Sequence, residues 1–250
     1  MAIDELVKVK RRIKTGEDRK VEAEVFDKQT LFALTKLISD RIVDEVEFPI
    51  ATGKESNVFR ARQAKNFLAL KIYCTTTSIF KDLSKYVIGD PRFAGIKKKN
   101  LVFVWARKEY KNLQALSEIY VRVPAPITCR GNVLVMEYIG TERRPAPMLK
   151  DVKLKRPIKL FNALVGYLKK AYNDANLVHG DFSEYNVLIE GNEKPVIIDV
   201  GQAVVREHPL AEELLVRDVA NIVSYFRKLG VNAEVNNIVK AIKNAGLKNT

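Results

Sequence analysis

Three polar residues in the second half of the chain have the types and spacing that phosphoryl transfer requires. Asp181 and Asn186 form a D-x-x-x-x-N pattern within the stretch LVHGDFSEYNVLIEGNEKPVIIDVGQ, and Asp199 follows an otherwise apolar run. Transfer of a γ-phosphoryl group needs a carboxylate that accepts the proton of the attacking hydroxyl and oxygen ligands that hold Mg²⁺ against the triphosphate. Asp181 suits the first task, and Asn186 and Asp199 suit the second.

The order of these residues is more specific than any one of them. An aspartate after a strand is usually a turn or helix cap, so Asp199 alone predicts little. Here His179, the D-x-x-x-x-N loop, a hairpin turning at Gly191-Asn192 and a buried strand from Val196 to Val200 follow one another. His179 is expected to support the loop through a backbone hydrogen bond rather than to act in catalysis.

A turn in the first half of the chain is a candidate phosphate cover. Residues 43–73 read as three antiparallel strands, and small or hydroxylated residues occupy the turn between the first two, where backbone amides can approach a phosphate. The turn and its flanks comprise Thr52, Gly53, Lys54, Glu55, Ser56, Asn57 and Val58. Alone the signal is weak, because the turn matches neither G-x-G-x-x-G nor a complete Walker A motif.

Lys71 and Glu109 are predicted to form an ion pair. Lys71 lies within the strand FLALKIY, where a charged side chain is costly to bury without a partner, although an edge-strand lysine that reaches solvent is the alternative. Glu109 lies on the apolar stripe of a helix over residues 101–120, and a glutamate there needs a cation. The stripe consists of Trp105, Leu113, Leu116 and Tyr120.

Two connecting segments complete this half of the chain. NVLVMEYIG, residues 132–140, reads as a buried strand leading to a connector, whose backbone N–H and C=O groups can bind an adenine edge next to Met136, Glu137 and Ile139. Residues 74–100 are long for a link between a strand and a helix, so we expect a flexible loop near the active site. Ser78 and Ser84 in this loop are candidate modification sites.

Further helices follow from apolar spacing and define the expected domain organisation. They are expected at residues 27–40, with Asp27 as N-cap, and at 158–171, 209–229 and 233–244. Residues 1–42 form a basic arm and an N-terminal helix, residues 43–140 an N-lobe and residues 141–250 a reduced C-lobe. Only 48 residues follow Gln202, too few for the activation segment and peptide-binding subdomain of ordinary kinases, and no A-P-E motif is present.

The composition favours an anionic binding partner and gives no sign of a membrane-spanning segment. The net charge is +13, from 43 Lys and Arg against 30 Asp and Glu, and phosphate contacts supply most non-specific nucleic-acid affinity. A solvated lysine-rich surface is nearly as good an explanation of the charge.

No apolar run can span a bilayer and no signal-peptide core is visible, so a cytoplasmic location is expected. Cys74 and Cys129 suggest neither a disulfide framework nor a zinc site.

Taken in order, these motifs resemble the RIO family of atypical serine/threonine kinases, and within it a minimal, archaeal-like member of the Rio-one subfamily. The resemblance extends from Ile50 to Phe226 and rests on TGKESNVF, the strand lysine, the helix glutamate, MEYI, VHGDFSEYN, IIDVGQ and HPLAEELLVRDVANI. It implies an α+β, two-lobed protein-kinase-like fold. The N-lobe would hold an antiparallel sheet plus one helix, and the helical C-lobe would lack the usual activation segment and peptide-binding subdomains.

The resemblance also implies roles and partners. ATP and Mg²⁺, or Mn²⁺ in its place, would be the cofactors; Lys71 would hold the phosphates, Asp181 would be the base, and Asn186 and Asp199 would bind the metal. Asp199 would also be able to accept a phosphoryl group in an ATPase-like cycle. The family resemblance further implies autophosphorylation on serine or a protein substrate, and action on a small ribosomal subunit precursor.

Two other functions share part of this pattern. A small-molecule phosphotransferase of the aminoglycoside-kinase type also carries H-G-D-x-x-x-x-N, but such chains usually devote a larger C-terminal region to the acceptor. A non-catalytic ribosome- or RNA-binding scaffold with a nucleotide pocket is the other alternative. A scaffold has no physical need for Lys71, a base and a complete metal set together, which favours the enzyme.

Overall fold

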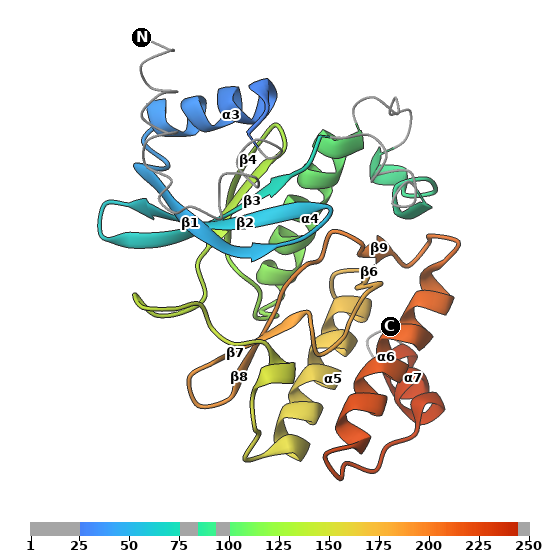
Figure 1. The fold of residues 1–250 in the computed structure, drawn as a ribbon. Coiled ribbons are helices and arrows are strands. Elements are labelled where there is room, and N and C mark those ends of the chain that lie inside the picture. Colours follow the sequence, from blue (N-terminus) through green and yellow to red (C-terminus); the bar gives the residue numbers. More distant parts are fainter. Residues whose placement is uncertain (1–25, 76–84, 94–100, 245–250) are drawn as a thin grey trace. The chain divides into compact units, whose positions relative to one another are not determined.

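The computed structural model describes residues 26–75, 85–93 and 101–244, and these residues divide into two compact units (Figure 1). The first unit holds 26–75, 101–110 and 125–138, and the second holds 85–93, 111–124 and 139–244. The basic arm and the serines at 78 and 84 lie outside the described residues. No helix of the described residues is long and apolar enough to cross a membrane.

The first unit begins with helix α3 (Lys28–Ser39), as predicted. Asp27 is its N-cap, because the side chain accepts the backbone N–H of Thr30 at 2.8 Å and so satisfies a donor that the first turn leaves open. Leu34 and Leu37 are fully buried on one side of the helix. The helix therefore enters the core of this unit through its apolar stripe.

A five-stranded antiparallel sheet forms the centre of the first unit, in the order β1-β2-β3-β5-β4 (Figure 1). Its strands are β1 (Glu45–Thr52), β2 (Ser56–Gln63), β3 (Asn66–Tyr73), β4 (Pro126–Arg130) and β5 (Val133–Glu137). Strand β4 was not predicted, because prolines 124 and 126 read only as the end of a helical region. It is an edge strand with proline as its first residue, a position where the missing N–H removes no interior ladder bond.

The two faces of β3 have different neighbours. Leu68, Leu70 and Ile72 belong to the apolar core that also contains Leu34 and Leu37 of α3. Because side chains alternate along a strand, Lys71 points to the opposite face. There it meets α4 (Leu101–Glu118), the helix that carries Glu109.

Helix α4 contains most of the predicted apolar stripe but ends earlier than expected. Trp105, Leu113 and Leu116 are buried as predicted. Tyr120 is not part of the stripe: it is 86% exposed and has a φ of 59°, which lies in the left-handed region. The helix ends at Glu118, and the left-handed turn directs this aromatic ring away from the apolar side.

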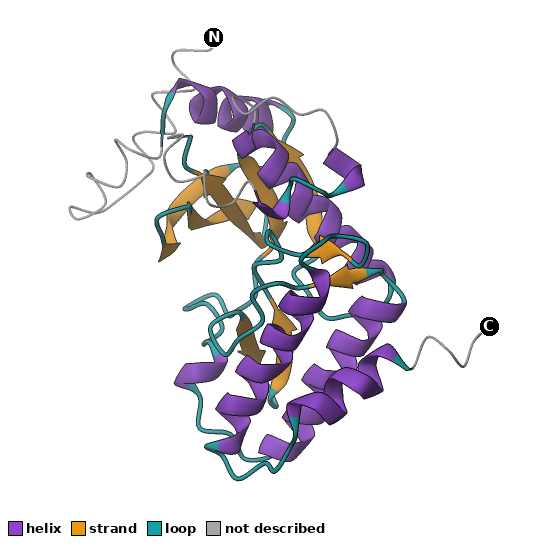
Figure 2. Ribbon diagram, turned by 90° about the vertical axis from the view of Figure 1, so that its right-hand side faces the viewer, coloured by secondary structure: helices purple, strands orange, loops and turns teal. Residues whose placement is uncertain are grey.

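The second unit is largely helical. Helices α5 (Pro157–Asn173), α6 (Ala211–Arg227) and α7 (Val235–Lys243) pack together, as Figure 2 shows, and confirm three predicted helices. Two short sheets accompany them, β6 (Leu177–Val178) with β9 (Val204–Val205) and β7 (Val187–Glu190) with β8 (Lys194–Ile197). The short helices η2 (Pro91–Phe93) and η4 (Leu149–Asp151) complete the unit.

The predicted strand from Val196 to Val200 is shorter than expected. Strand β8 ends at Ile197, and Asp199 has a φ of 58°. A left-handed residue cannot continue a strand, so the chain turns before Asp199 rather than after it. Asp199 therefore belongs to the connection between β8 and β9.

Candidate active site

The ion pair of Lys71 and Glu109 is present in the first unit. The Nζ atom of Lys71 lies 2.9 and 2.8 Å from the two carboxylate oxygens of Glu109. The side chains are 7% and 1% exposed, so both charges are almost removed from water. A buried pair of this kind is held by its mutual attraction and is costly to break from one side.

The turn between β1 and β2 lies next to the end of β3, the strand that carries Lys71. Backbone N–H of Gly53 donates to the carbonyl of Ser56 at 3.1 Å, and N–H of Cys74 donates to the carbonyl of Glu55 at 2.9 Å. Val58 is the cross-strand neighbour of Lys71 in the register of β2 and β3. The other predicted turn residues are the exposed Thr52 and Lys54 and the buried Asn57.

The predicted connector residues belong to different units. Met136 and Glu137 end β5 in the first unit, and Met136 is buried. The backbone N–H of Glu137 already donates to the carbonyl of Ala125 at 2.9 Å. Ile139 lies in the second unit, is buried, and its carbonyl accepts the N–H of Ala146 at 2.9 Å.

Asp181 and Asn186 are in direct contact in the second unit. The Nδ2 group of Asn186 donates to the Asp181 carboxylate at 3.1 Å and to the backbone carbonyl of Asp181 at 2.8 Å. Both contacts use the amide nitrogen, so the amide oxygen of Asn186 is the atom left to bind a cation. The D-x-x-x-x-N spacing thus folds into a compact loop between β6 and β7.

Asp199 lies close enough to Asp181 to influence its ionisation. Burial raises the pKa of Asp181 above its ordinary value, and the negative charge of Asp199 raises it further, while the hydrogen bond from Asn186 and the charge of Arg217 lower it. Two neighbouring carboxylates create a negative potential that a cation relieves. The described residues contain no group of three or more His, Cys, Asp and Glu side chains arranged around a metal. A hard cation such as Mg²⁺ needs only a carboxylate and an amide oxygen from the protein, and Asp199 and Asn186 offer them.

His179 holds the loop to the segment before Asp199, as predicted. The backbone N–H of Asp181 approaches its Nδ1 at 3.3 Å, and its Nε2 lies 3.3 Å from the carbonyl of Ile198. A carbonyl can only accept, so Nε2 carries the proton and Nδ1 is the acceptor, which describes a neutral imidazole. A second link joins Ile198 N–H to the carbonyl of Asn186 at 3.0 Å.

Asp218 on helix α6 is a site residue that the sequence analysis did not assign. Its buried carboxylate accepts the backbone N–H groups of Gly180 and Phe182, each at 2.8 Å, and these residues flank Asp181. Its neighbour Arg217 donates to the carbonyl of Gly180 and also bonds Tyr86. A sequence signal for Asp218 exists, because this acidic residue lies on the same apolar helical stripe as Leu215 and Ile222. Glu109 was predicted from the same kind of position on α4.

The structure thus brings the predicted residues together in two groups. In the first unit, Lys71 and Glu109 lie next to the turn over residues 52–58. In the second unit, the loop with Asp181 and Asn186 lies next to the connection that carries Asp199, and His179 links the two. A carboxylate with a raised pKa beside oxygen ligands is suited to move a proton next to a bound cation.

A family model described as the RIO domain matches residues 57–238, more than half of the chain. The chain belongs to the RIO family. It is 42% identical over 228 residues to the RIO-type serine/threonine-protein kinase Rio1 of Methanocaldococcus jannaschii, covering 90% of this chain and 78% of that protein. It is 41% identical over 227 residues to human serine/threonine-protein kinase RIO1, covering 88% of this chain and 40% of the human protein. Because these relatives are RIO-type serine/threonine-protein kinases, the chain is an atypical serine/threonine kinase.

Solved structures support the same fold. The Rio2 kinase of Chaetomium thermophilum, solved as an ADP/Mg²⁺-phosphoaspartate complex, matches with a TM-score of 0.66 and 24% identity. The match covers 85% of this chain and 66% of the other. This RIO-family chain therefore has the protein-kinase-like α+β fold that its motifs implied.

Proposed function

We propose that this RIO-family kinase transfers the γ-phosphoryl group of ATP in a Mg²⁺-dependent reaction with Asp181 as the base. The observation that carries the proposal is the contact of Asp181 with Asn186 beside Asp199. A base must be held in place and must have a pKa shifted toward the working pH. Burial and the charge of Asp199 raise the pKa of Asp181 in that direction, and the Asn186 amide fixes its carboxylate.

Asn186 and Asp199 fit the requirements of Mg²⁺ or Mn²⁺. The amide oxygen of Asn186 and the carboxylate of Asp199 are hard oxygen ligands, and Mg²⁺ accepts few of these because water and phosphate complete its shell. When bound, the metal neutralises charge on the phosphate oxygens. Asn186 would have two tasks, since its Nδ2 holds Asp181 and its oxygen would bind the cation.

The first unit supplies the groups that hold the nucleotide. Lys71 would contact the phosphates, and Glu109 fixes the lysine ammonium through both carboxylate oxygens. The turn over residues 52–58 would cover the phosphates with its backbone amides. Met136, Glu137 and Ile139 would line the adenine, where backbone N–H and C=O groups can bind its polar edge.

An ATPase branch is part of the proposal. Asp199 is exposed, and a carboxylate oxygen of this residue can attack the γ-phosphorus while ADP leaves; water then hydrolyses the acyl phosphate. The Chaetomium Rio2 kinase was solved as a phosphoaspartate complex, which supports considering this branch here. In the kinase branch a serine hydroxyl, of this chain or of a protein substrate, attacks instead and Asp181 takes its proton.

We place the reaction on a small ribosomal subunit precursor. The support is a basic surface of the second unit between residues 143 and 159, where every Lys and Arg is exposed. These residues are Arg143, Arg144, Lys150, Lys153, Lys155, Arg156 and Lys159. Lys150 lies 4.8 Å above the ring of the exposed Tyr185, between Asp181 and Asn186 in sequence. Cations next to an exposed aromatic ring are suited to phosphate contacts and base stacking.

The test is to incubate purified protein with Mg²⁺ and ATP labelled at the γ-phosphate, with and without small ribosomal subunits, and to follow protein-bound label and free phosphate. Alkali-stable label on serine establishes the kinase branch. Alkali-labile label or phosphate release stimulated by the subunits establishes the ATPase branch. Nucleotide binding with neither label nor release would contradict the proposal and favour a scaffold.

A further inference from the structure

A buried side chain from α4 holds the turn that follows Asp199. The Nδ2 group of Asn112 donates to the carbonyl of Val200 at 2.8 Å and to the carbonyl of Ala203 at 3.2 Å. These carbonyls are the two ends of the turn, which is closed by the N–H of Ala203 donating to Val200 at 3.2 Å. Asn112 is fully buried, so water does not compete for either contact.

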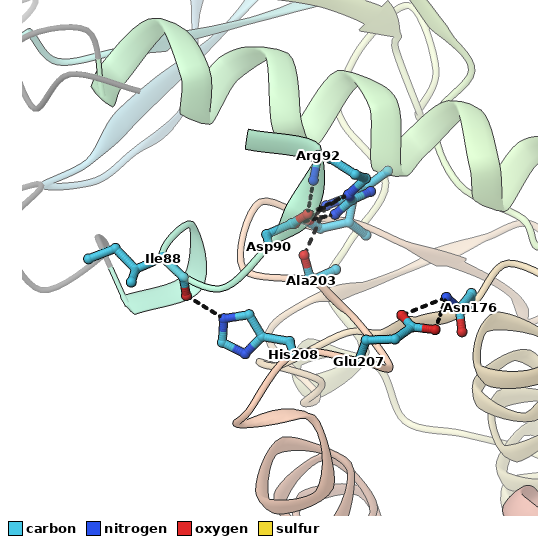
Figure 3. Close-up of polar contacts among 9 residues, drawn as sticks. Ile88, Asp90, Arg92, Asn176, Ala203, Glu207 and His208 are labelled. Atoms are coloured by element: carbon cyan, nitrogen blue, oxygen red, sulfur yellow. Dashed lines mark hydrogen bonds and ion pairs between the residues drawn. The ribbon is translucent and has the colours of Figure 1, made fainter. Parts of the chain in front are cut away.

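The orientation of the Asn112 amide is set from the other side. Its Oδ1 accepts from the guanidinium of Arg92 at 2.9 Å. A guanidinium only donates and carbonyls only accept, so the amide can take just one orientation between them. The Asp90 carboxylate, whose side chain is 0% exposed, in turn holds Arg92 through contacts of 2.7 to 3.2 Å (Figure 3).

The segment that provides Asp90 and Arg92 is fixed at two further points within the second unit. The carbonyl of Ile88 lies 2.9 Å from Nε2 of His208, between β9 and α6 (Figure 3). Tyr86 is hydrogen-bonded to Arg217, which also bonds the carbonyl of Gly180. Residues 85–93 are therefore also attached to the chain after the turn that follows Asp199, through His208 and Arg217.

Asp199 needs such restraint. Its φ of 58° lies in the left-handed region, which is unfavourable for a residue with a Cβ atom. Such a conformation is kept only where the surrounding structure holds the backbone in place. The turn after it also touches the catalytic loop, because a Cβ atom on Gly180 would lie 3.1 Å from the carbonyl oxygen of Gln202. The position of this turn thus affects both the carboxylate of Asp199 and the backbone next to Asp181.

We propose that Asn112 is a positioning residue for Asp199, and that Arg92 and Asp90 keep its amide in the working orientation. The inference rests on the proposed function, in which Asp199 binds the metal. Outer residues that orient a metal ligand commonly change metal affinity by about 10- to 100-fold when removed. Loss of Asn112 should therefore weaken the metal's contribution to nucleotide binding without weakening the nucleotide contacts of the first unit.

The experiment measures binding rather than turnover. A fluorescent N-methylanthraniloyl ADP is titrated into the protein once with EDTA and once with Mg²⁺, and the ratio of the two dissociation constants reports the metal's contribution. For Asn112→Ala we expect this ratio to shrink by about tenfold, with the dissociation constant in EDTA unchanged. Arg92→Gln, at a half-buried position, should shift the ratio in the same direction and serves if Asn112→Ala does not fold.

Two reference variants make the result decisive. Glu207→Ala removes a polar contact of the segment between β9 and α6, with Asn176 at 3.0 and 2.8 Å (Figure 3), and does not alter the contacts of Asn112, so its ratio should equal that of the unchanged protein. Asp199→Asn should abolish the metal's contribution. If Asp199→Asn does so while folded Asn112→Ala and Arg92→Gln keep the original ratio, the inference is overturned and the proposed function stands. If Asp199→Asn itself keeps the ratio, the metal assignment fails and the inference fails with it.

Discussion

The carboxylate of Asp218 on helix α6 accepts the backbone N–H of Phe182, the residue after Asp181, at 2.8 Å, and its other oxygen accepts the N–H of Gly180 at the same distance. An asparagine offers only one acceptor oxygen and would leave the second N–H facing an amide nitrogen. We expect Asp218→Asn to lower the free energy of unfolding by at least about 1 kcal/mol and to reduce phosphoryl transfer. Denaturant unfolding and a labelled-ATP assay measure the two effects. Glu213→Gln, an exposed acid on the same helix, should change neither.

Asp218 should also give stability a particular pH dependence. Burial raises its pKa to about 7 from 3.8, against the two backbone hydrogen bonds, which lower it. Between these values the folded chain holds the proton and the unfolded chain does not, so this group's contribution to the free energy of unfolding falls as pH rises. The slope is about 1.4 kcal/mol per pH unit. Unfolding of the natural protein and of Asp218→Asn from pH 4 to 7 should show their difference shrinking; a constant difference would mean that Asp218 is ionised throughout.

Variants of the Lys71–Glu109 ion pair should affect stability and phosphoryl transfer differently. Glu109→Gln leaves a buried ammonium without its counter-charge and should destabilise the protein by about 3 kcal/mol. The double variant Lys71→Met with Glu109→Leu should recover much of that stability, since apolar residues can replace a buried pair, but it should not recover phosphoryl transfer. Thermal unfolding and the transfer assay on both variants, with the exposed Glu118→Gln as control, test this. Transfer by the double variant would remove Lys71 from the proposed site.

Substitution by alanine should change the free energy of unfolding in opposite directions at two glycines. Gly180 has a φ of 80°, and an added Cβ atom would lie 3.1 Å from the carbonyl oxygen of Gln202. Gly180→Ala should destabilise by about 1–2 kcal/mol and disturb the loop that holds Asp181. Gly166 lies within α5 with nothing within 4 Å of such an atom, so Gly166→Ala should stabilise by about 0.5–1 kcal/mol. Equal effects at both positions, measured by denaturant unfolding, would contradict the loop geometry.

Local patterns in the sequence were enough to predict the ion pair of Lys71 and Glu109 and the loop that brings Asp181 and Asn186 together. Glu109 was found because a charge on an apolar helical stripe needs a partner, and Lys71 was the buried strand residue able to provide one. The same argument applies to Asp218, whose partners are backbone N–H groups rather than a cation. Backbone partners carry no side-chain signature, so the sequence does not reveal them.

Other features depend on contacts between distant segments. Asn112 bonds Val200 and Ala203, and neither helix spacing nor residue type specifies that pairing. The left-handed conformation of Asp199 likewise follows from the turn that holds it, whereas the run VIID reads as an uninterrupted strand. Strand β4 was hidden because its prolines favour a chain break as strongly as an edge strand.

The most direct test of the central claim is the effect of Asp181→Ala on transfer of the γ-phosphoryl group to a serine hydroxyl in a single turnover. We predict a rate loss of at least about 100-fold, because the variant removes the proton acceptor. Folding and the affinity for the fluorescent ADP and Mg²⁺ should be preserved, because Asn186 keeps its bond to the backbone carbonyl of residue 181 at 2.8 Å. Glu184→Ala, an acid in the same loop, is the matched control and should transfer at the normal rate. Transfer at an unchanged rate by Asp181→Ala would contradict the assignment of Asp181 as the base.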